Sequence, residues 1–173
     1  MLLKTIGIAL TIGCSGVYGM MGARRLEKRA GQLKQLRLAM NFLEKEITCM
    51  NTPLAQALMR TAKFSPSPVN LFFLETSSQL HGKRGLTSHE AWSRGLEKLH
   101  RESSLREEDL DLLGSMVAQI GLSHTDEQKK LFNLIQEELR IQEGKSLAEV
   151  EAGRKLWVYG GFILGTMVVI LLI

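Results

Sequence analysis

The feature that most constrains this chain is the separation of two apolar ends from a charged middle. Residues 5–23 and 156–173 contain no Asp, Glu, Lys or Arg, whereas the stretch between them holds every acidic residue and every basic residue except Lys4. At about 1.5 Å per helical residue, each run is just long enough to cross a hydrocarbon layer of roughly 30 Å. The sequence therefore predicts transmembrane helices over 1–23 and 156–173, with a water-exposed module between them.

Basic residues next to the apolar ends predict how the chain is oriented. The six are Arg24, Arg25, Lys28, Arg29, Arg154 and Lys155. Flanks rich in Lys and Arg stay on the cytoplasmic side of a membrane, so we expect a cytoplasmic module and both termini outside. Residues 30–153 carry 15 basic and 17 acidic residues. This balance argues against nucleic acid as a partner, which would require basic residues clustered on the module itself.

A different reading of the first segment is lipid attachment at Cys14, which follows Gly13. Thr11 stands where such a motif usually carries Leu. A cleaved secretory signal is also disfavoured, because its basic residues would precede the apolar run, whereas here they follow it. We therefore expect a membrane anchor that is retained in the mature protein.

Small residues recur at helical spacing in both apolar segments. They are Ser15, Gly19 and Ala23 in the first, and Gly161 and Gly165 in the second. Such spacing predicts close helix packing, either of the two spans with each other, with other membrane subunits, or with a second copy of the chain. Glycine is also simply common in membrane helices, and the sequence does not separate these readings.

The module between the spans is predicted to be all-α. A stripe with spacings of 7, 3, 4, 3 and 4 indicates a helix that continues out of the first span; its members are Leu26, Leu33, Leu36, Met40, Leu43 and Ile47. Further helices are expected to start with Thr52 as N-cap, at Pro68, with Ser88 as N-cap, near Arg106, and at Thr125 or Asp126. This gives a bundle of about six helices over 24–141. A helical stalk over 142–155, which Gly144 could bend, leads to the second span.

The apolar spacing also predicts which side chains form the core. The expected residues are Leu54, Ala57, Leu58, Ala62, Val69, Phe72, Phe73, Leu80, Trp92, Leu96, Leu99, Leu110, Leu113, Val117, Ile120, Leu131, Leu134, Ile135 and Leu139. Their number is sufficient for one apolar core shared by all the helices.

The sequence offers no constellation for catalysis. No two of the four histidines are four residues apart, and Gly144-Lys145-Ser146 lacks the first glycine of a phosphate loop because Leu139 stands there. We therefore expect no enzyme activity, no cofactor and no metal. The acidic residues Glu44, Glu46, Glu107, Glu108, Asp109 and Asp111 are either solvated helix faces or docking points for a basic partner surface.

Several tracts, in this order between two apolar ends, resemble the stage III sporulation protein AB family of endospore-forming bacteria. They are Gln32–Arg37 with Leu43–Ile47, Thr52–Leu54 with Ala57 and Leu58, Gly121–Ser123 with Gln128 and Lys129, and the glycine-rich terminal segment. One departure is His124, where the family pattern leads us to expect an acidic residue.

The resemblance implies a function that periodicity and charge do not. That family is similar to the cytoplasmic domains of platform proteins in type II secretion and type IV pilus machines, through Pro53–Leu58 and Leu86–Trp92. It implies a component of the mother-cell-to-forespore channel, located in the mother-cell membrane around the forespore, with a secretion-type ATPase and other membrane subunits as partners. The alternative is a membrane-tethered regulator that transmits a signal through its continuous helices.

Overall fold

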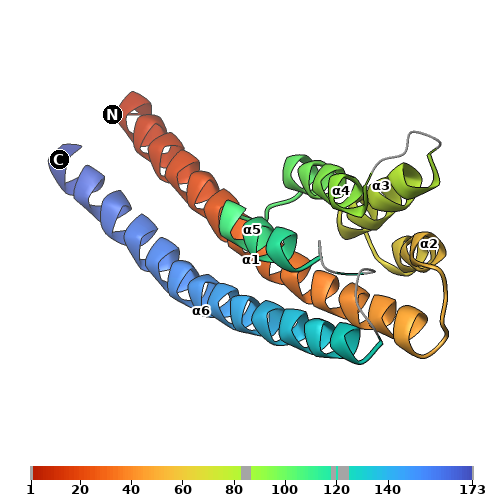
Figure 1. Cartoon of the computed structure of the whole chain (residues 1–173). Coiled ribbons are helices and arrows are strands. Elements are labelled where there is room, and N and C mark those ends of the chain that lie inside the picture. The colour runs from red at the N-terminus through yellow and green to blue at the C-terminus, as the bar shows by residue number, and fades with distance from the viewer. Residues whose placement is uncertain (1, 83–86, 118–119, 121–124, 173) are drawn as a thin grey trace. The chain divides into compact units, whose positions relative to one another are not determined.

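Six α-helices form the computed structural model, and no strand occurs among the residues that it describes. The backbone is described for residues 2–82, 87–117, 120 and 125–172, and nearly all described side chains lie between residues 22 and 153. The helices are α1 (Leu2–Thr48), α2 (Leu54–Phe64), α3 (Val69–His81), α4 (Ser88–Glu102), α5 (Glu107–Val117) and α6 (Thr125–Leu172) (Figure 1). The all-α prediction is confirmed, as is the continuation of the first helix beyond its apolar segment.

The chain divides into two units, and both long helices run through each of them. The first unit holds residues 1–30 and 145–173, and the second unit is Gly31–Gly144. All four short helices therefore belong to the second unit. The predicted stalk, residues 142–155, is an uninterrupted part of α6, so Gly144 does not end the helix there.

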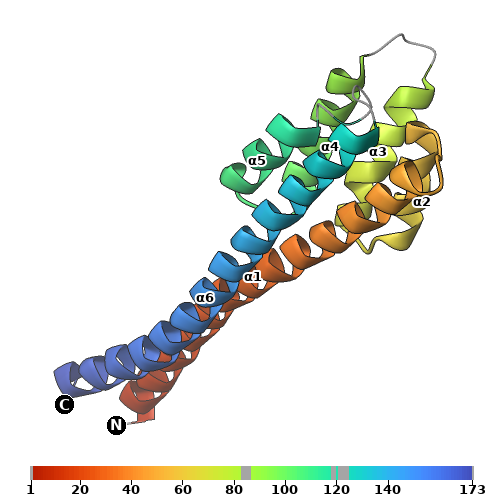
Figure 2. The ribbon, with the colours of Figure 1, turned by 60° about the horizontal axis from the view of Figure 1, so that its bottom comes forward.

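One apolar core fills the second unit. The short helices pack in chain order, α2 on α3, α3 on α4 and α4 on α5 (Figure 2). The ring of Phe72 lies 4.8 Å from that of Phe73 and 5.5 Å from that of Trp92, measured between centroids, so aromatic contacts join α3 to α4. The central part of the α1 stripe faces the same core and is fully buried: Leu33, Leu36, Met40 and Leu43.

The core prediction is right for α2 to α5 and partly wrong for α6. Ile135 and Leu139 are fully buried as expected, but Leu134 is 52% exposed and Phe132 is buried in its place. Phe132 and Leu139 lie three before and four after Ile135, on the same face of α6, whereas Leu134 is rotated by about 100° from Ile135 and faces outward. The apolar side chain of Leu134 therefore lies at the surface.

The turn between α1 and α2 depends on Asn51, whose φ of 51° lies in the left-handed region. Asn adopts this conformation more readily than most residues with a Cβ atom. Pro53 precedes α2, and its carbonyl accepts the first helical hydrogen bonds, from the backbone N–H of Gln56 and Ala57. The prediction that Thr52 caps α2 is wrong, because its hydroxyl donates a hydrogen bond to Glu46.

A capping box begins α4, one residue earlier than predicted. Thr87, not Ser88, is the N-cap: its hydroxyl accepts from the backbone N–H of Glu90, and the Glu90 carboxylate accepts from the N–H of Thr87 at 2.8 Å. These bonds satisfy two donors that a helix start otherwise leaves free. The hydrogen bond from the Thr87 backbone lowers the pKa of Glu90 below its usual value.

In the first unit, the α1 and α6 segments run antiparallel and side by side (Figures 1 and 2). Arg29 is 3% exposed and forms a 3.1 Å ion pair with Glu149. A Cβ atom on Gly153 would come within 2.8 Å of Leu26, so the helices approach closely at this glycine. The segments predicted as transmembrane helices have side chains almost wholly outside the described residues, including Ser15, Gly19, Ala23, Gly161 and Gly165.

Within the part of the chain that is described, no helix has the length and apolarity required to cross a membrane.

We predict that Gly95→Ala destabilises the second unit by about 1–3 kcal/mol, because overpacking forces neighbours to move. A Cβ atom at Gly95 would overlap the Thr76 hydroxyl and lie 2.9 Å from the Phe72 carbonyl oxygen, both on α3. The control is Gly31→Ala, where a Cβ atom meets nothing within 4 Å. The control should stabilise the helix by up to about 1 kcal/mol. Melting temperatures of the full chain in detergent, followed by circular dichroism, compare the two, and equal melting temperatures would contradict the close α3–α4 packing.

Candidate interaction surfaces

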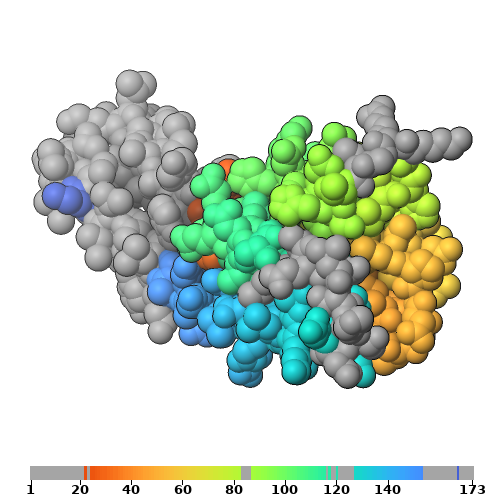
Figure 3. All heavy atoms as spheres, in the orientation of Figure 1, coloured from red at the N-terminus to blue at the C-terminus, as the bar shows by residue number. Residues whose placement is uncertain are grey.

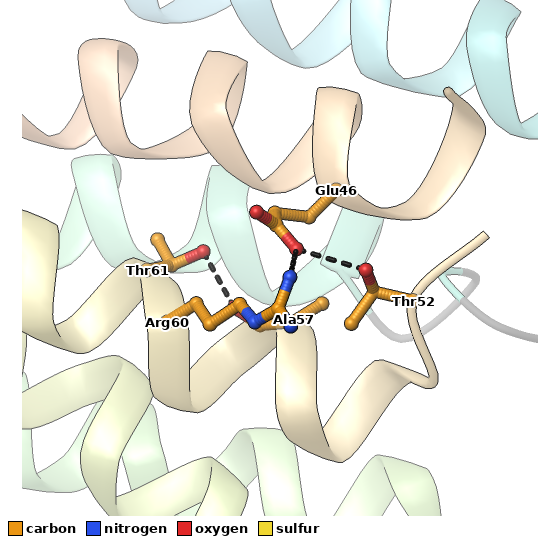
Figure 4. A network of polar contacts seen from close by, with 5 residues as sticks. All are labelled: Glu46, Thr52, Ala57, Arg60 and Thr61. Atoms are coloured by element: carbon orange, nitrogen blue, oxygen red, sulfur yellow. Dashed lines mark hydrogen bonds and ion pairs between the residues drawn. The ribbon is translucent and has the colours of Figure 1, made fainter. Parts of the chain in front are cut away.

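Glu46 is the centre of a polar network between α1 and α2 (Figure 4). One oxygen of its carboxylate accepts hydrogen bonds from the Thr52 hydroxyl and from the Arg60 guanidinium, both at 2.9 Å. Glu46 is 5% exposed, so its charge is compensated inside the fold and is not offered to solvent. The expectation that Glu46 belongs to an acidic docking surface is corrected here, and we assign it a structural role.

Asp109 is likewise buried. It is 1% exposed, and its carboxylate accepts a 3.0 Å hydrogen bond from the backbone N–H of Arg106, just before α5. An acidic side chain in this place satisfies a free backbone donor and is favoured by the helix dipole. Asp109 therefore helps to begin α5, and its predicted place on an exposed docking surface is corrected.

The remaining acidic residues of α5 stay at the surface. Glu107, Glu108 and Asp111 are exposed in the first two turns, and α5 contains no basic residue. In the space-filling view of Figure 3, α5 (blue-green) lies at the surface of the second unit. The structure thus brings three of the six predicted docking carboxylates together on one exposed helix. We call these three residues the α5 acidic surface.

Glu44 differs from both groups. It is half-buried on α1, and this burial raises the pKa of its carboxyl group, while the positive charges of Lys45 and Lys129 partly oppose the shift. Lys129 belongs to α6, so a cation of the other long helix acts on Glu44 within the second unit. A carboxylate whose charged form is disfavoured by burial is less suited to docking than an exposed one.

The basic residues that were predicted to fix topology fall into two groups. Arg24, Arg25 and Lys28 are exposed, as a charge at a membrane boundary needs to be. Arg29 is buried and paired with Glu149, so it also holds the two helices of the first unit together. The side chains of Arg154 and Lys155, and the residue His124, lie outside the described residues.

Sequence reasoning missed a surface that α1 and α2 share. The rings of Phe42 and Phe64 are stacked, with centroids 4.6 Å apart and planes 8° apart, yet Phe64 is 56% exposed. Leu38, one turn before Phe42, is also exposed, as are the basic residues on either side of it, Lys34 and Lys45. The only signal in the sequence was an apolar residue between lysines on the outer face of a helix. We call Lys34, Leu38, Phe42, Lys45, Lys63 and Phe64 the α1–α2 face.

No group of three or more His, Cys, Asp or Glu side chains among the described residues is placed to hold a metal ion. Cys49 is exposed and forms no disulfide. The two surfaces that the described residues form are one acidic surface on α5 and one basic and apolar surface on α1 and α2.

Comparisons with known proteins agree with this architecture. The sequence profile of the stage III sporulation protein AB family matches residues 4–173. Stage III sporulation protein AB of Bacillus subtilis (strain 168) is 28% identical over 171 residues, which cover 99% of each chain. A solved structure of stage III sporulation protein AB (SpoIIIAB) superposes with a TM-score of 0.65 and 29% identity, covering 71% of this chain and 96% of that one.

We predict that Arg60→Met lowers the free energy of unfolding by about 1–3 kcal/mol, because the buried Glu46 carboxylate loses one of its two partners. The matched control is Arg101→Met, which removes a pair with Glu97 in which the side chains are 72% and 67% exposed. Exposed pairs contribute little, so the control should cost less than about 0.5 kcal/mol. Urea unfolding of both variants measures the difference, and equal losses would show that the Glu46 network does not stabilise the fold.

Proposed function

Since the chain belongs to the stage III sporulation protein AB family, we propose that it is a non-catalytic membrane platform of the channel between mother cell and forespore. Family membership makes it a sporulation protein. The proposal adds three finer statements: two membrane spans, a cytoplasmic second unit, and docking of a secretion-type ATPase. The observation that carries it is a helical module whose two long helices end in uncharged, apolar sequence.

The membrane part of the proposal is supported by charge and helix continuity. The segments 5–23 and 156–173 contain no charged residue, and each continues an α-helix of the second unit without interruption. Exposed Arg24, Arg25 and Lys28 directly follow the first apolar segment. Cations at this place favour the cytoplasmic side of the mother-cell membrane for the second unit.

The docking part is supported by the α5 acidic surface. Three exposed carboxylates on a helix without cations produce a local negative field, which guides a basic partner surface and favours one orientation. A mechanical platform needs such a surface but no catalytic residues. We therefore propose Glu107, Glu108 and Asp111 as contacts for the ATPase.

A regulatory role is the second candidate. It is favoured by α1 and α6, which are 47 and 48 residues long and each pass from one unit into the other. A signal carried along them would need a ligand outside the membrane.

The proposed topology predicts that Cys49 reacts with a membrane-impermeant maleimide only after the cells are opened. Cys49 is exposed in the second unit, which makes it a native reporter of that unit's side of the membrane. The experiment uses a Cys14→Ser background. The chain is produced in non-sporulating cells, so that the outer face of its membrane meets the medium, and the control is Lys4→Cys with Cys49→Ser, which should react in these intact cells. Labelling of Cys49 in intact cells would reject a cytoplasmic module and the ATPase role with it.

Charge reversal of the α5 acidic surface should weaken co-purification of the ATPase with the full chain from membranes. We expect Glu107→Lys with Glu108→Lys to reduce the retained ATPase by about tenfold, since a repulsive charge at an interface costs roughly 1.4 kcal/mol or more. The matched control, Glu127→Lys with Glu137→Lys, makes the same charge change at exposed positions of α6. Unchanged retention in the α5 variant would reject α5 as the docking site and leave the platform role standing.

A further inference from the structure

We propose that the α1–α2 face binds an acidic amphipathic helix of a partner protein. The proposal extends the platform role, because it gives the second unit a docking surface separate from α5 and opposite to it in charge. It rests on three observations: exposed lysines of which two form no salt bridge among the described residues, a stacked aromatic pair with one exposed ring, and a length that suits a helix.

The charge of this face is only partly compensated by its own elements. Residues 31–64 contain only two acidic residues, Glu44 and Glu46. Glu46 is buried and paired with Arg60, and Glu44 is half-buried with the charges of Lys45 and of Lys129 on α6 acting on it. Lys34 and Lys63 are exposed and form no salt bridge with any residue that the structure describes. A positive field with so few local counter-charges selects an acidic partner.

The apolar part of the face is ordered before any partner arrives. Phe64 of α2 is stacked on Phe42 of α1, and Leu38 lies one helical turn from Phe42 on the same side of α1. Phe64 and Leu38 are 56% and 48% exposed. Large side chains that are exposed yet held in place lose little conformational entropy on binding, and aromatic residues of this kind dominate many protein interfaces.

The length of the α1–α2 face suits the docking of a partner's helix. Lys34, Leu38 and Lys45 share the outer side of α1 and span about 16 Å along its axis, at about 1.5 Å per residue. An acidic helix of three to four turns laid along α1 would place carboxylates near both lysines and an apolar side chain on Leu38 and the Phe42–Phe64 pair. This is the arrangement by which amphipathic helices dock on helical proteins.

A basic and apolar face can also bind a lipid membrane, so a membrane surface is the alternative to a protein partner. The α1–α2 face favours a protein, because Lys34 and Lys45 lie on the same side of α1 as Leu38, and the exposed ring of Phe64 is stacked on Phe42. A helix that lies in a membrane instead presents a continuous apolar side, with its basic residues on the opposite side.

The test uses the full chain in uncharged phosphatidylcholine nanodiscs and a fluorescein-labelled synthetic 18-residue helix of Glu, Leu and Ala, with Glu and Leu on separate sides. Fluorescence anisotropy measures the Kd. We expect Lys34→Glu with Lys63→Glu, and separately Phe64→Ser, to raise the Kd about tenfold or more while the melting temperature stays unchanged. Raising the salt concentration should weaken binding of the original chain.

Two controls make the outcome decisive. A peptide of the same composition in scrambled order should bind at least about tenfold more weakly, because its acidic and apolar residues no longer lie on separate sides. Lys130→Glu with Lys145→Glu changes the net charge equally at exposed positions of α6 and should leave the Kd unchanged.

The proposal would be overturned if the two peptides bound with equal Kd. It would also be overturned if Lys130→Glu with Lys145→Glu raised the Kd as much as Lys34→Glu with Lys63→Glu, because the effect would then be general charge attraction. A third contrary result would be that the chain binds vesicles containing phosphatidylglycerol but not the peptide, and that Lys34→Glu with Lys63→Glu abolishes this vesicle binding. None of these results affects ATPase co-purification, which tests α5.

Discussion

The fold depends on a single constraint: α1 must bury one narrow apolar stripe in the core and leave the rest of its surface outside that core. Leu33, Leu36, Met40 and Leu43 are fully buried, and they line the core onto which the short helices pack. Because this stripe repeats at alternating intervals of three and four residues, it fixes the rotation of α1 about its axis. That rotation determines which side of α1 each of the other side chains lies on, including Lys34, Leu38 and Glu44.

Local signals in the sequence were sufficient to predict the helices and most of the core. The spacing of apolar residues, the prolines before α2 and α3 and the acidic start of α5 each act over one or two turns, which is the range that a sequence shows directly. The errors were also local. Thr87 and Ser88 are both good caps, and the choice between them depends on which hydroxyl reaches the Glu90 backbone. Leu134 was assigned to the core by its apolar character, although its rotation relative to Ile135 excludes it.

The candidate surfaces were less predictable because they depend on contacts between distant elements. Glu46 looks like any solvated glutamate until the turn at Asn51 brings Arg60 back to it. Phe64 had no assigned role, and only the structure shows its ring stacked on Phe42 at the end of α2. In both cases the side chain's role is set by a partner on another helix, and no spacing within one helix reports it.

Burial has a further consequence for the charge of the surface. The fold withdraws Glu46 and partly withdraws Glu44 from the outer side of α1, and Lys34 and Lys63 of the α1–α2 face form no salt bridge with any described residue. On α5 it withdraws only Asp109 as a cap, and the three other carboxylates remain exposed. A module whose total charge is nearly balanced thus presents two surfaces of opposite sign. Because like charges repel strongly at interfaces, an acidic helix that suits the proposed site on the α1–α2 face would be repelled by the α5 acidic surface, so the two proposed sites would not compete for one partner.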